Sequence, residues 1–340
     1  MEIIKYTIKE NLTLPQNFLK LYATTNFGLF DIETTGLSRE KSHIILIGIL
    51  YIENNSIIIE QFFCKNRSEE KEMLISFIEK IEQLPLLINY NGNTFDIPFL
   101  NKRFKINNIN HQIGTHKSID LLKVIRKNQK KLGMKNCKLK TLEEFLGIYR
   151  KDTISGKESV ELYNVFEESQ NKNIKDIILL HNHDDLYYLA KALKVLDEIP
   201  YDQLISVFPQ IFNTSDVTIG YIANHSIKRN VLSLEGFYPS KCMLDYIDYQ
   251  NAFDLEYNKE INTFCIKIPL YKGYLPSGEK CLYISIDDFD FPKENEFIKN
   301  TLENILIFKE NNNISTLNIY KFSSLFVPYI FNTLDKKRDS

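Results

Sequence analysis

Acidic side chains recur in widely separated segments of this 340-residue chain, each of them beside an apolar stretch. Asp31 and Glu33 come first, and Asp96, Asp120 and Asp185 follow in separate segments. Carboxylates that a fold brings together repel one another and lose solvation, so such a cluster persists mainly where divalent cations neutralise it. The acids therefore predict a metal site assembled from distant parts of the chain.

Apolar periodicity predicts strands and helices around these acids. Residues 27–33 alternate so that Asp31 and Glu33 share one face of a strand. Residues 43–52, apolar on both faces, are typical of a central strand, and 56–63 of its hairpin partner. The remaining segments predict helices at 69–83, 95–104 and 176–197 and strands at 85–91 and 118–122. This order predicts an α/β, ribonuclease-H-like mixed sheet of five strands flanked by helices.

The pattern changes at Ile199-Pro200, where short strands such as 264–269 and 281–286 alternate with Gly and Asn turns. We therefore expect an N-terminal extension (1–24), a ribonuclease-H-like domain that carries the acids (25–198) and a small β-rich C-terminal domain of unknown role (199–340). The C-terminal domain contains aromatic residues such as Tyr271, Tyr274 and Tyr283. We interpret them as packing residues, and the alternative is that they stack on exposed nucleic-acid bases.

Cysteine usage and hydropathy indicate a cytoplasmic protein. Five cysteines are odd in number and lack a C-x-x-C pair, which argues against a disulfide framework. The longest apolar run, 44–52, is too short to span a bilayer, so no membrane association is expected.

The formal net charge of −2 supplies no global attraction for nucleic acid. One local exception is the stretch 126–140, which carries seven basic side chains and no acid. It either follows phosphates or forms a solvated helix end and loop.

Three motifs resemble those of the DEDD superfamily of 3′-5′ exonucleases: Asp31-x-Glu33-Thr-Thr-Gly36, Asn91-x-x-x-Phe95-Asp96 and a helical Asp185. A closer resemblance, over about residues 25–197, is to the bacterial YprB-type ribonuclease-H-like family. It is carried by Tyr90-Asn-Gly-x-x-Phe-Asp-x-Pro-x-Leu100, Asp120-Leu-Leu122, Lys140-Thr-Leu-Glu-Glu-Phe-Leu-Gly147, Gly156 and His181-Asn-x-x-Asp185.

This resemblance implies a two-metal hydrolysis of phosphodiester bonds with Asp31, Glu33, Asp96 and Asp185 as ligands. Two divalent cations roughly 3.5 to 4 Å apart stabilise the attacking and leaving oxygens, and carboxylate oxygens suit Mg²⁺ or Mn²⁺. By analogy, Asp31 bridges the ions, Glu33 and Asp185 serve the ion on the nucleophile side, and Asp96 supports the cluster.

His181 lies four residues before Asp185, on nearly the same helix face, and is the candidate general base. Relatives place a histidine five residues before the last aspartate, or a tyrosine four before it, so this spacing departs from the superfamily. The alternative is a helix-capping or core histidine. Asp185 is preferred to Asp184 because only Asp185 borders the apolar stripe of the predicted helix.

Thr34, Thr35, Gly36 and Leu37 follow the first acids and are candidate substrate-binding residues, with Leu37 against a terminal base as in relatives. A plain turn is the alternative. Asp120 either faces the metals or caps a helix, and it is left out of the predicted ligand set.

The sequence thus predicts a metal-dependent 3′-5′ exonuclease that acts on single-stranded nucleic-acid 3′ ends. The competing hypothesis is a non-catalytic nucleic-acid-binding or scaffold module with the same fold.

Overall fold

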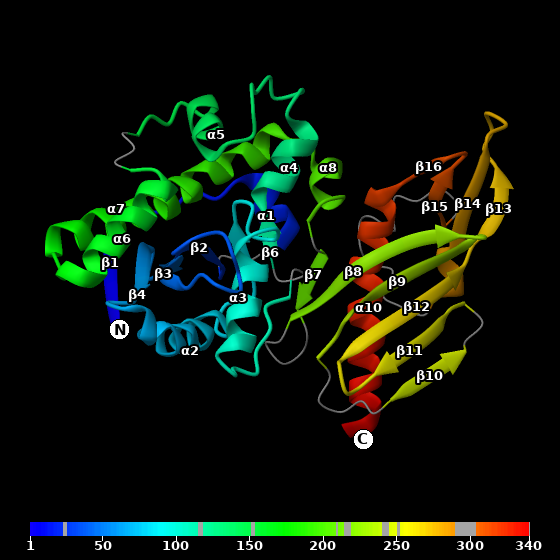
Figure 1. Cartoon of the computed structure of the whole chain (residues 1–340). Coiled ribbons are helices and arrows are strands. Elements are labelled where there is room, and N and C mark those ends of the chain that lie inside the picture. Colours follow the sequence, from blue (N-terminus) through cyan, green and yellow to red (C-terminus); the bar gives the residue numbers. More distant parts are fainter. Residues whose placement is uncertain are drawn as a thin grey trace. The chain divides into compact units, whose positions relative to one another are not determined.

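A computed structural model describes residues 1–22, 26–114, 118–150, 154–208, 210–213, 219–239, 245–249, 252–289 and 304–339. The chain divides into two compact units, Met1–Val207 and Phe208–Ser340 (Figure 1). Four cysteines are free thiols, and Cys242 lies outside the described residues. No helix in the described ranges is both long and apolar enough to cross a membrane.

The first unit contains one sheet and its covering helices. Its strands are β1 (Glu2–Ile8), β2 (Gly28–Thr34), β3 (Ile44–Glu53), β4 (Ser56–Phe63), β5 (Leu87–Asn89) and β6 (Ser118–Asp120). Its helices are α1 (Gln16–Tyr22), η1 (Arg67–Glu69), α2 (Glu70–Ile81), α3 (Asp96–Ile106), α4 (Leu121–Asn128), α5 (Leu139–Phe145), α6 (Gly156–Ser169), α7 (Lys172–Ala192), η3 (Leu193–Glu198) and α8 (Tyr201–Ile205).

The strand order β1-β4-β3-β2-β5-β6 confirms the predicted ribonuclease-H-like mixed sheet, with six strands instead of five. The pairs β1–β4, β4–β3 and β3–β2 are antiparallel. β5 pairs with β2, and β6 with β5, in parallel. The predicted N-terminal extension is wrong for residues 2–8, because β1 pairs with β4 from Glu2↔Phe63 to Ile8↔Ile57. Most β1 side chains are half-buried or exposed, so the strand lacks a strong apolar pattern.

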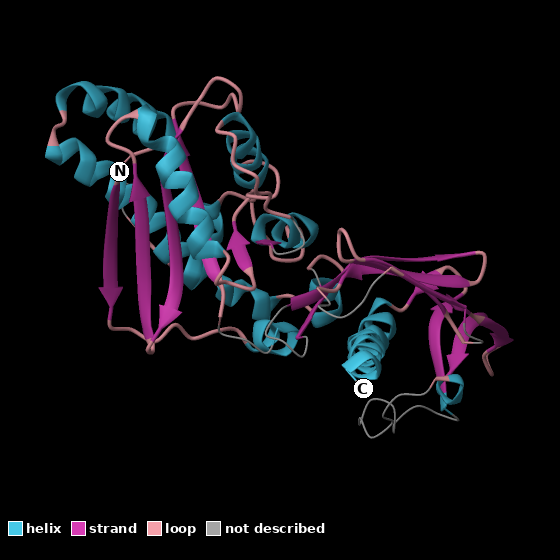
Figure 2. Cartoon of the chain, turned by 90° about the horizontal axis from the view of Figure 1, so that it is seen from below, coloured by secondary structure: helices cyan, strands magenta, loops and turns pink. Residues whose placement is uncertain are grey.

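Helices cover both faces of this sheet, and its long strands lie side by side (Figure 2). On one face, Leu46 and Phe63 pack with apolar residues of α6 and α7, including Tyr163. On the other, Ile47 joins a cluster with α2 and α3, including Phe77. β3 is therefore apolar on both faces because each face is covered.

The unit boundary lies nine residues beyond the predicted one at 198/199 because the chain after α7 packs on α1. Asn17 Nδ2 donates to the carbonyls of Leu196 (2.9 Å) and Ile199 (3.1 Å). Asp197 accepts hydrogen bonds from the backbone amides of Gln16 and Asn17. Through these hydrogen bonds, residues 196–199 pack as part of the first unit.

The second unit is rich in strands, as predicted, and also contains a long helix that was not predicted. Its elements are β7 (Gln210–Asn213), β8 (Ile219–Lys228), β9 (Val231–Phe237), β10 (Tyr246–Tyr249), β11 (Asp254–Asn258), β12 (Thr263–Pro269), β13 (Tyr271–Tyr274), β14 (Lys280–Ser285), η4 (Ile286–Asp288), β15 (Ile305–Glu310), β16 (Asn313–Ile314) and α10 (Thr316–Asp339). The strands form two sheets, β10-β11-β12-β9-β8-β7 and β13-β14-β15-β16.

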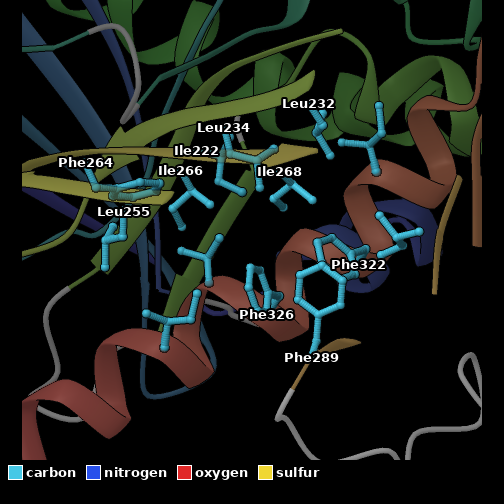
Figure 3. Close-up of a cluster of buried hydrophobic side chains, with 14 of the residues drawn as sticks. Ile222, Leu232, Leu234, Leu255, Phe264, Ile266, Ile268, Phe289, Phe322 and Phe326 are labelled. Carbon is cyan, nitrogen blue, oxygen red and sulfur yellow. The ribbon is translucent and has the colours of Figure 1, made fainter. Parts of the chain in front are cut away.

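The core of the second unit lies between these sheets and α10. Phe322 and Phe326 of α10 face Leu234 and Ile266 of the larger sheet, and Phe289 completes the cluster (Figure 3). The unit therefore has an apolar core of its own.

Candidate active site

β2 carries Asp31 and Glu33 on one face, because successive strand residues alternate. The strand lies between β3 and β5, and Glu33 is only 8% exposed. Burial, and after it the charge of Asp185, raises the pKa of Glu33 to about 8. Burial also raises the pKa of Asp31 well above its usual range, and the charges of Asp96, Asp185 and Glu33 act in the same direction.

Asp96 is the first residue of α3 and is 5% exposed. A helix N-terminus favours a negative charge, but burial outweighs this effect and raises the pKa of Asp96 to about 7. The backbone amides of Asp96 itself and of Ile32 oppose the rise. Since Ile32 lies between Asp31 and Glu33, the Asp96 carboxyl lies against the acid-bearing part of β2.

A buried chain of hydrogen bonds orients Asp31. Asn182 Nδ2 on α7 donates to Asp31 Oδ2 at 3.0 Å, and Gln61 Nε2 donates to Asn182 Oδ1 at 2.8 Å. Asp31 and Gln61 both lie opposite Gly48 in the sheet register. A Cβ atom on Gly48 would lie 2.0 Å from Asn182 Oδ1 and 2.6 Å from Leu186 Cδ1. The absence of a side chain at Gly48 thus lets α7 approach the strands closely.

α7 also brings His181 and Asp185 to the two acids of β2. His181 Nε2 lies 3.5 Å from Glu33 Oε1 and 3.9 Å from Asp185 Oδ2. Asp184 contacts the neighbouring His183 instead, at 3.1 Å. Asp31, Glu33, Asp96 and Asp185 are called the acid cluster below.

One acid of the cluster has an internal cationic partner. Arg150 Nη2 lies 2.6 Å from Asp185 Oδ1, while Arg150 Nε donates to Glu143 Oε2 at 3.0 Å. The guanidinium carbon lies 5.4 Å from the centre of the Tyr188 ring. Arg150 is therefore held by a carboxylate and an aromatic ring while it neutralises Asp185.

A cavity of about 750 Å³ joins the acids to the turn after β2 and to the start of α6. Its lining includes Asp31, Glu33, Thr34, Gly36, Leu37, Phe95, Leu139, Arg150, Ile154, Ser155, Gly156, Lys157, Val160, Glu161, His181 and Asp185. Leu37 is 84% exposed and lines the cavity, so its apolar side chain is accessible to a ligand. Thr35 is absent from this lining, and its hydroxyl accepts a hydrogen bond from the His43 amide at 2.9 Å.

The chemistry of the acid cluster fits divalent cations. Its oxygens are hard ligands, and mutual repulsion is the effect that a bound cation removes. As the side chains stand, no three His, Cys, Asp or Glu residues in the described ranges are arranged to hold a metal ion. Asp185 illustrates this arrangement, because its Oδ1 contacts the cationic Arg150.

A sequence comparison places this site in a known fold class. The first unit contains a ribonuclease-H-like domain, and residues 29–196 match the RNase_H superfamily. An uncharacterized protein of Methanocaldococcus jannaschii is 28% identical over 176 residues, which are 49% of this chain and 93% of that protein.

Two solved structures are more distantly similar. A family B DNA polymerase of Pyrobaculum calidifontis is 13% identical, with a TM-score of 0.39 over 72% of this chain and 39% of the polymerase. E. coli exonuclease I in complex with a dT13 oligonucleotide is 14% identical, with a TM-score of 0.32 over 62% of this chain and 55% of that enzyme. This chain therefore spans about half or less of the length of these structures.

The structure brings five predicted residues together: Asp31, Glu33, Asp96, His181 and Asp185. Asp120 is a helix cap instead, because its Oδ1 accepts from the Leu122 amide at 3.1 Å and from the Asn91 amide at 2.8 Å.

Four contributors were not predicted: Gly48, Gln61, Arg150 and Asn182. Asn182 lies inside the motif between His181 and Asp185, so its position was a usable signal. Arg150 and Gln61 follow no local pattern that links them to the acids.

Proposed function

We propose that this chain is a metal-dependent nuclease that hydrolyses phosphodiester bonds. The observation that carries the proposal is the convergence of Asp31, Glu33, His181 and Asp185 from β2 and α7 at one cavity, with Asp96 of α3 close enough for its charge to raise the pKa of Asp31. Buried acids that raise one another's pKa are costly to a fold, and such clusters are typical of functional sites.

The finer assignment is a 3′-5′ exonuclease of the DEDD type, most similar to the YprB-type family, acting on single-stranded 3′ ends in the cytoplasm. Mg²⁺ or Mn²⁺, held by Asp31, Glu33, Asp96 and Asp185, would supply the positive charge that stabilises the attacking and leaving oxygens. The sequence motifs support this assignment. Leu37 and Phe95 in the cavity lining offer apolar contact to a terminal base.

His181 would accept the proton of the attacking water. Its Nε2 lies 3.5 Å from Glu33 Oε1 and 3.9 Å from Asp185 Oδ2, so the ring reaches the carboxyls that would hold the metal and its bound water. Asn182 keeps the Asp31 carboxylate in one orientation, a function that positioning hydrogen bonds commonly serve at metal sites.

A cleavage assay tests the proposal. The substrates are 5′-labelled single-stranded and duplex DNA and RNA, with Mn²⁺, Mg²⁺ or EDTA and with Asp96→Asn as the inactive control. A metal-dependent ladder that shortens from the 3′ end supports the exonuclease. Internal cuts would retain the nuclease and overturn the exonuclease assignment.

The alternative is a non-catalytic nucleic-acid-binding module, and the 2.6 Å pair between Arg150 and Asp185 favours it, since an arginine already neutralises one acid. Calorimetric titration with Mn²⁺ separates the two. Two bound ions that disappear in Asp31→Ala support the nuclease, whereas no binding and no cleavage support the module.

A further inference from the structure

One face of the sheet β13-β14-β15 collects lysines around an exposed aromatic residue. Lys272, Leu282 and Lys309 are direct neighbours in the register of the three strands, and Tyr274 pairs with Lys280. Residues two apart on a strand share a face, so these five side chains lie on the same side. They are called the lysine face.

The lysine face is concave. A cavity of about 360 Å³ is lined by all five of its residues, together with Asn230 and Asn311. Asn230 belongs to the two-residue turn between β8 and β9, and its carbonyl accepts a hydrogen bond from the Leu270 amide at 2.8 Å. The lining thus joins both sheets of the second unit through backbone contacts.

No ion pair involves the lysine face in the part of the chain that the structure describes, although Glu279 lies beside it, since its Oε1 accepts a hydrogen bond from Asn311 Nδ2 of the lining at 3.1 Å. There, Lys272, Lys280 and Lys309 have no carboxylate within ion-pair distance, and the cavity lining contains no acid. Lys267, in the neighbouring sheet, shows the contrasting arrangement, because it pairs with Glu256 at 3.0 Å. Three unpaired ammonium groups in one hollow favour an anionic ligand with several charges.

Tyr274 narrows the class of ligand. Its side chain is 71% exposed although it lies among the lysines. A flat exposed ring next to cations is the combination with which proteins hold single-stranded nucleic acid, since phosphates contact the cations and bases stack on the ring. Leu282 adds an apolar contact between Lys272 and Lys309.

We propose that the lysine face binds a single-stranded nucleic acid, with Lys272, Lys280 and Lys309 at successive phosphates and Tyr274 under a base. This site is separate in the sequence from the acid cluster. It gives the second unit a function of its own and does not depend on whether the first unit cleaves.

Fluorescence anisotropy with a labelled dT15 oligonucleotide in EDTA tests the charge contribution, using the full chain. The triple variant Lys272→Ala, Lys280→Ala, Lys309→Ala should bind at least about tenfold more weakly at 50 mM salt. The slope of log Kd against log salt should fall by about 2, because each single-strand phosphate contact contributes roughly 0.7. Unchanged melting temperatures would establish that the variants fold.

A charge-matched control is the triple variant Lys71→Ala, Lys105→Ala, Lys123→Ala, which removes three exposed helix lysines of the first unit. Equal weakening by both triple variants would overturn the proposal, because the effect would then follow net charge alone. No weakening by the lysine-face variant would overturn it as well.

Tyr274→Ala tests the stacking contribution, with Tyr249→Ala as the matched control because Tyr249 is 72% exposed. Only Tyr274→Ala should weaken dT15 binding, by about tenfold, and it should leave competition by inorganic polyphosphate unchanged. Equal affinity of Tyr274→Ala and the wild type for dT15 would overturn the nucleic-acid assignment. Because EDTA excludes catalysis, these results are independent of the cleavage assay.

Discussion

The acid cluster and the lysine face hold like charges together by opposite means. The acid cluster is buried, and its carboxyls respond with raised pKa values, as for Glu33 at about 8 and Asp96 at about 7. Lys272 and Lys280 are exposed, so water solvates their charges. Buried repulsion destabilises a fold, whereas exposed charges contribute little. The contrast indicates that the acid cluster is maintained at a cost in stability, which a bound cation would offset.

Neutralising one acid should produce the largest effect. We expect Asp31→Asn to lower cleavage by ~10³-fold, as expected when one preorganised charged group of an active site is lost. The same substitution should raise the free energy of unfolding in EDTA, because it removes repulsion and keeps an acceptor for Asn182. Both quantities are measured on one preparation, by the cleavage assay and by urea unfolding.

Asp176→Asn is the control for that experiment, because Asp176 is exposed on α7. It should leave cleavage and stability within error of the wild type. An Asp31→Asn protein that is less stable than the wild type in EDTA would contradict the contrast, since the acids would then not oppose folding.

The raised pKa values predict how stability varies with pH in EDTA. Between the ordinary carboxyl range near 4.5 and about pH 8, folded Glu33 binds a proton that the unfolded chain has lost. Stability should therefore decrease as the pH rises through this window, by at most ~1.4 kcal/mol per pH unit for each such carboxyl. Asp96 contributes in the same direction up to about pH 7.

Mn²⁺ should reverse this dependence, because metal binding requires deprotonated carboxylates. We expect the increase in melting temperature on adding Mn²⁺ to be larger at pH 8 than at pH 6. Thermal unfolding at both pH values, with Mn²⁺ and with EDTA, measures it. The Asp31→Ala protein should show no increase, and an equal increase at both pH values would argue against the raised pKa values.

The close packing of α7 against β3 can be disrupted by a substitution that leaves every charge in place. Gly48→Ala should lower the free energy of unfolding by ~1–3 kcal/mol, the usual cost of overpacking, since the added Cβ would lie 2.0 Å from Asn182 Oδ1. Urea unfolding measures the change. Gly156→Ala is the control, because a Cβ there meets nothing within 4 Å. Equal stabilities of the two variants would show that α7 shifts freely.

Local patterns in the sequence were sufficient to predict β2, β3, β4, α2 and α7 to within a few residues, because these elements have strong apolar periodicity. The same patterns placed Asp31 and Glu33 on one strand face and Asp185 on the helix face that meets them. β1 was not predicted because every one of its side chains is half-buried or exposed, and the helix α10 (316–339) was not predicted either.

The contacts that Asn182 and Arg150 make with the acids, and that Gln61 makes with Asn182, could not be predicted from the sequence. Gln61 and Asp31 meet Asn182 only because both lie opposite Gly48, and this register is a property of the assembled sheet. Arg150 likewise reaches Asp185 from a segment with no pattern of its own. Residue types and spacing thus identified the acids, while their partners depended on the tertiary structure.

The smallest expected effect concerns the pair between Arg150 and Asp185, where the acid cluster, unlike the lysine face, has a counter-ion of its own. A metal ion that uses Asp185 Oδ1 must first displace the guanidinium. We therefore expect Arg150→Gln to bind Mn²⁺ about tenfold more tightly, or ~1.4 kcal/mol, because the ion no longer competes with a cation for this carboxylate. Calorimetric titration measures the affinity.

Arg150→Lys is the matched control for this last substitution, because it keeps a positive charge while it loses the guanidinium that contacts both Asp185 and Glu143. Its affinity for Mn²⁺ should stay closer to that of the wild type than the affinity of Arg150→Gln. Weaker Mn²⁺ binding by Arg150→Gln than by Arg150→Lys would reverse the interpretation. Arg150 would then support the acid cluster by orienting Asp185.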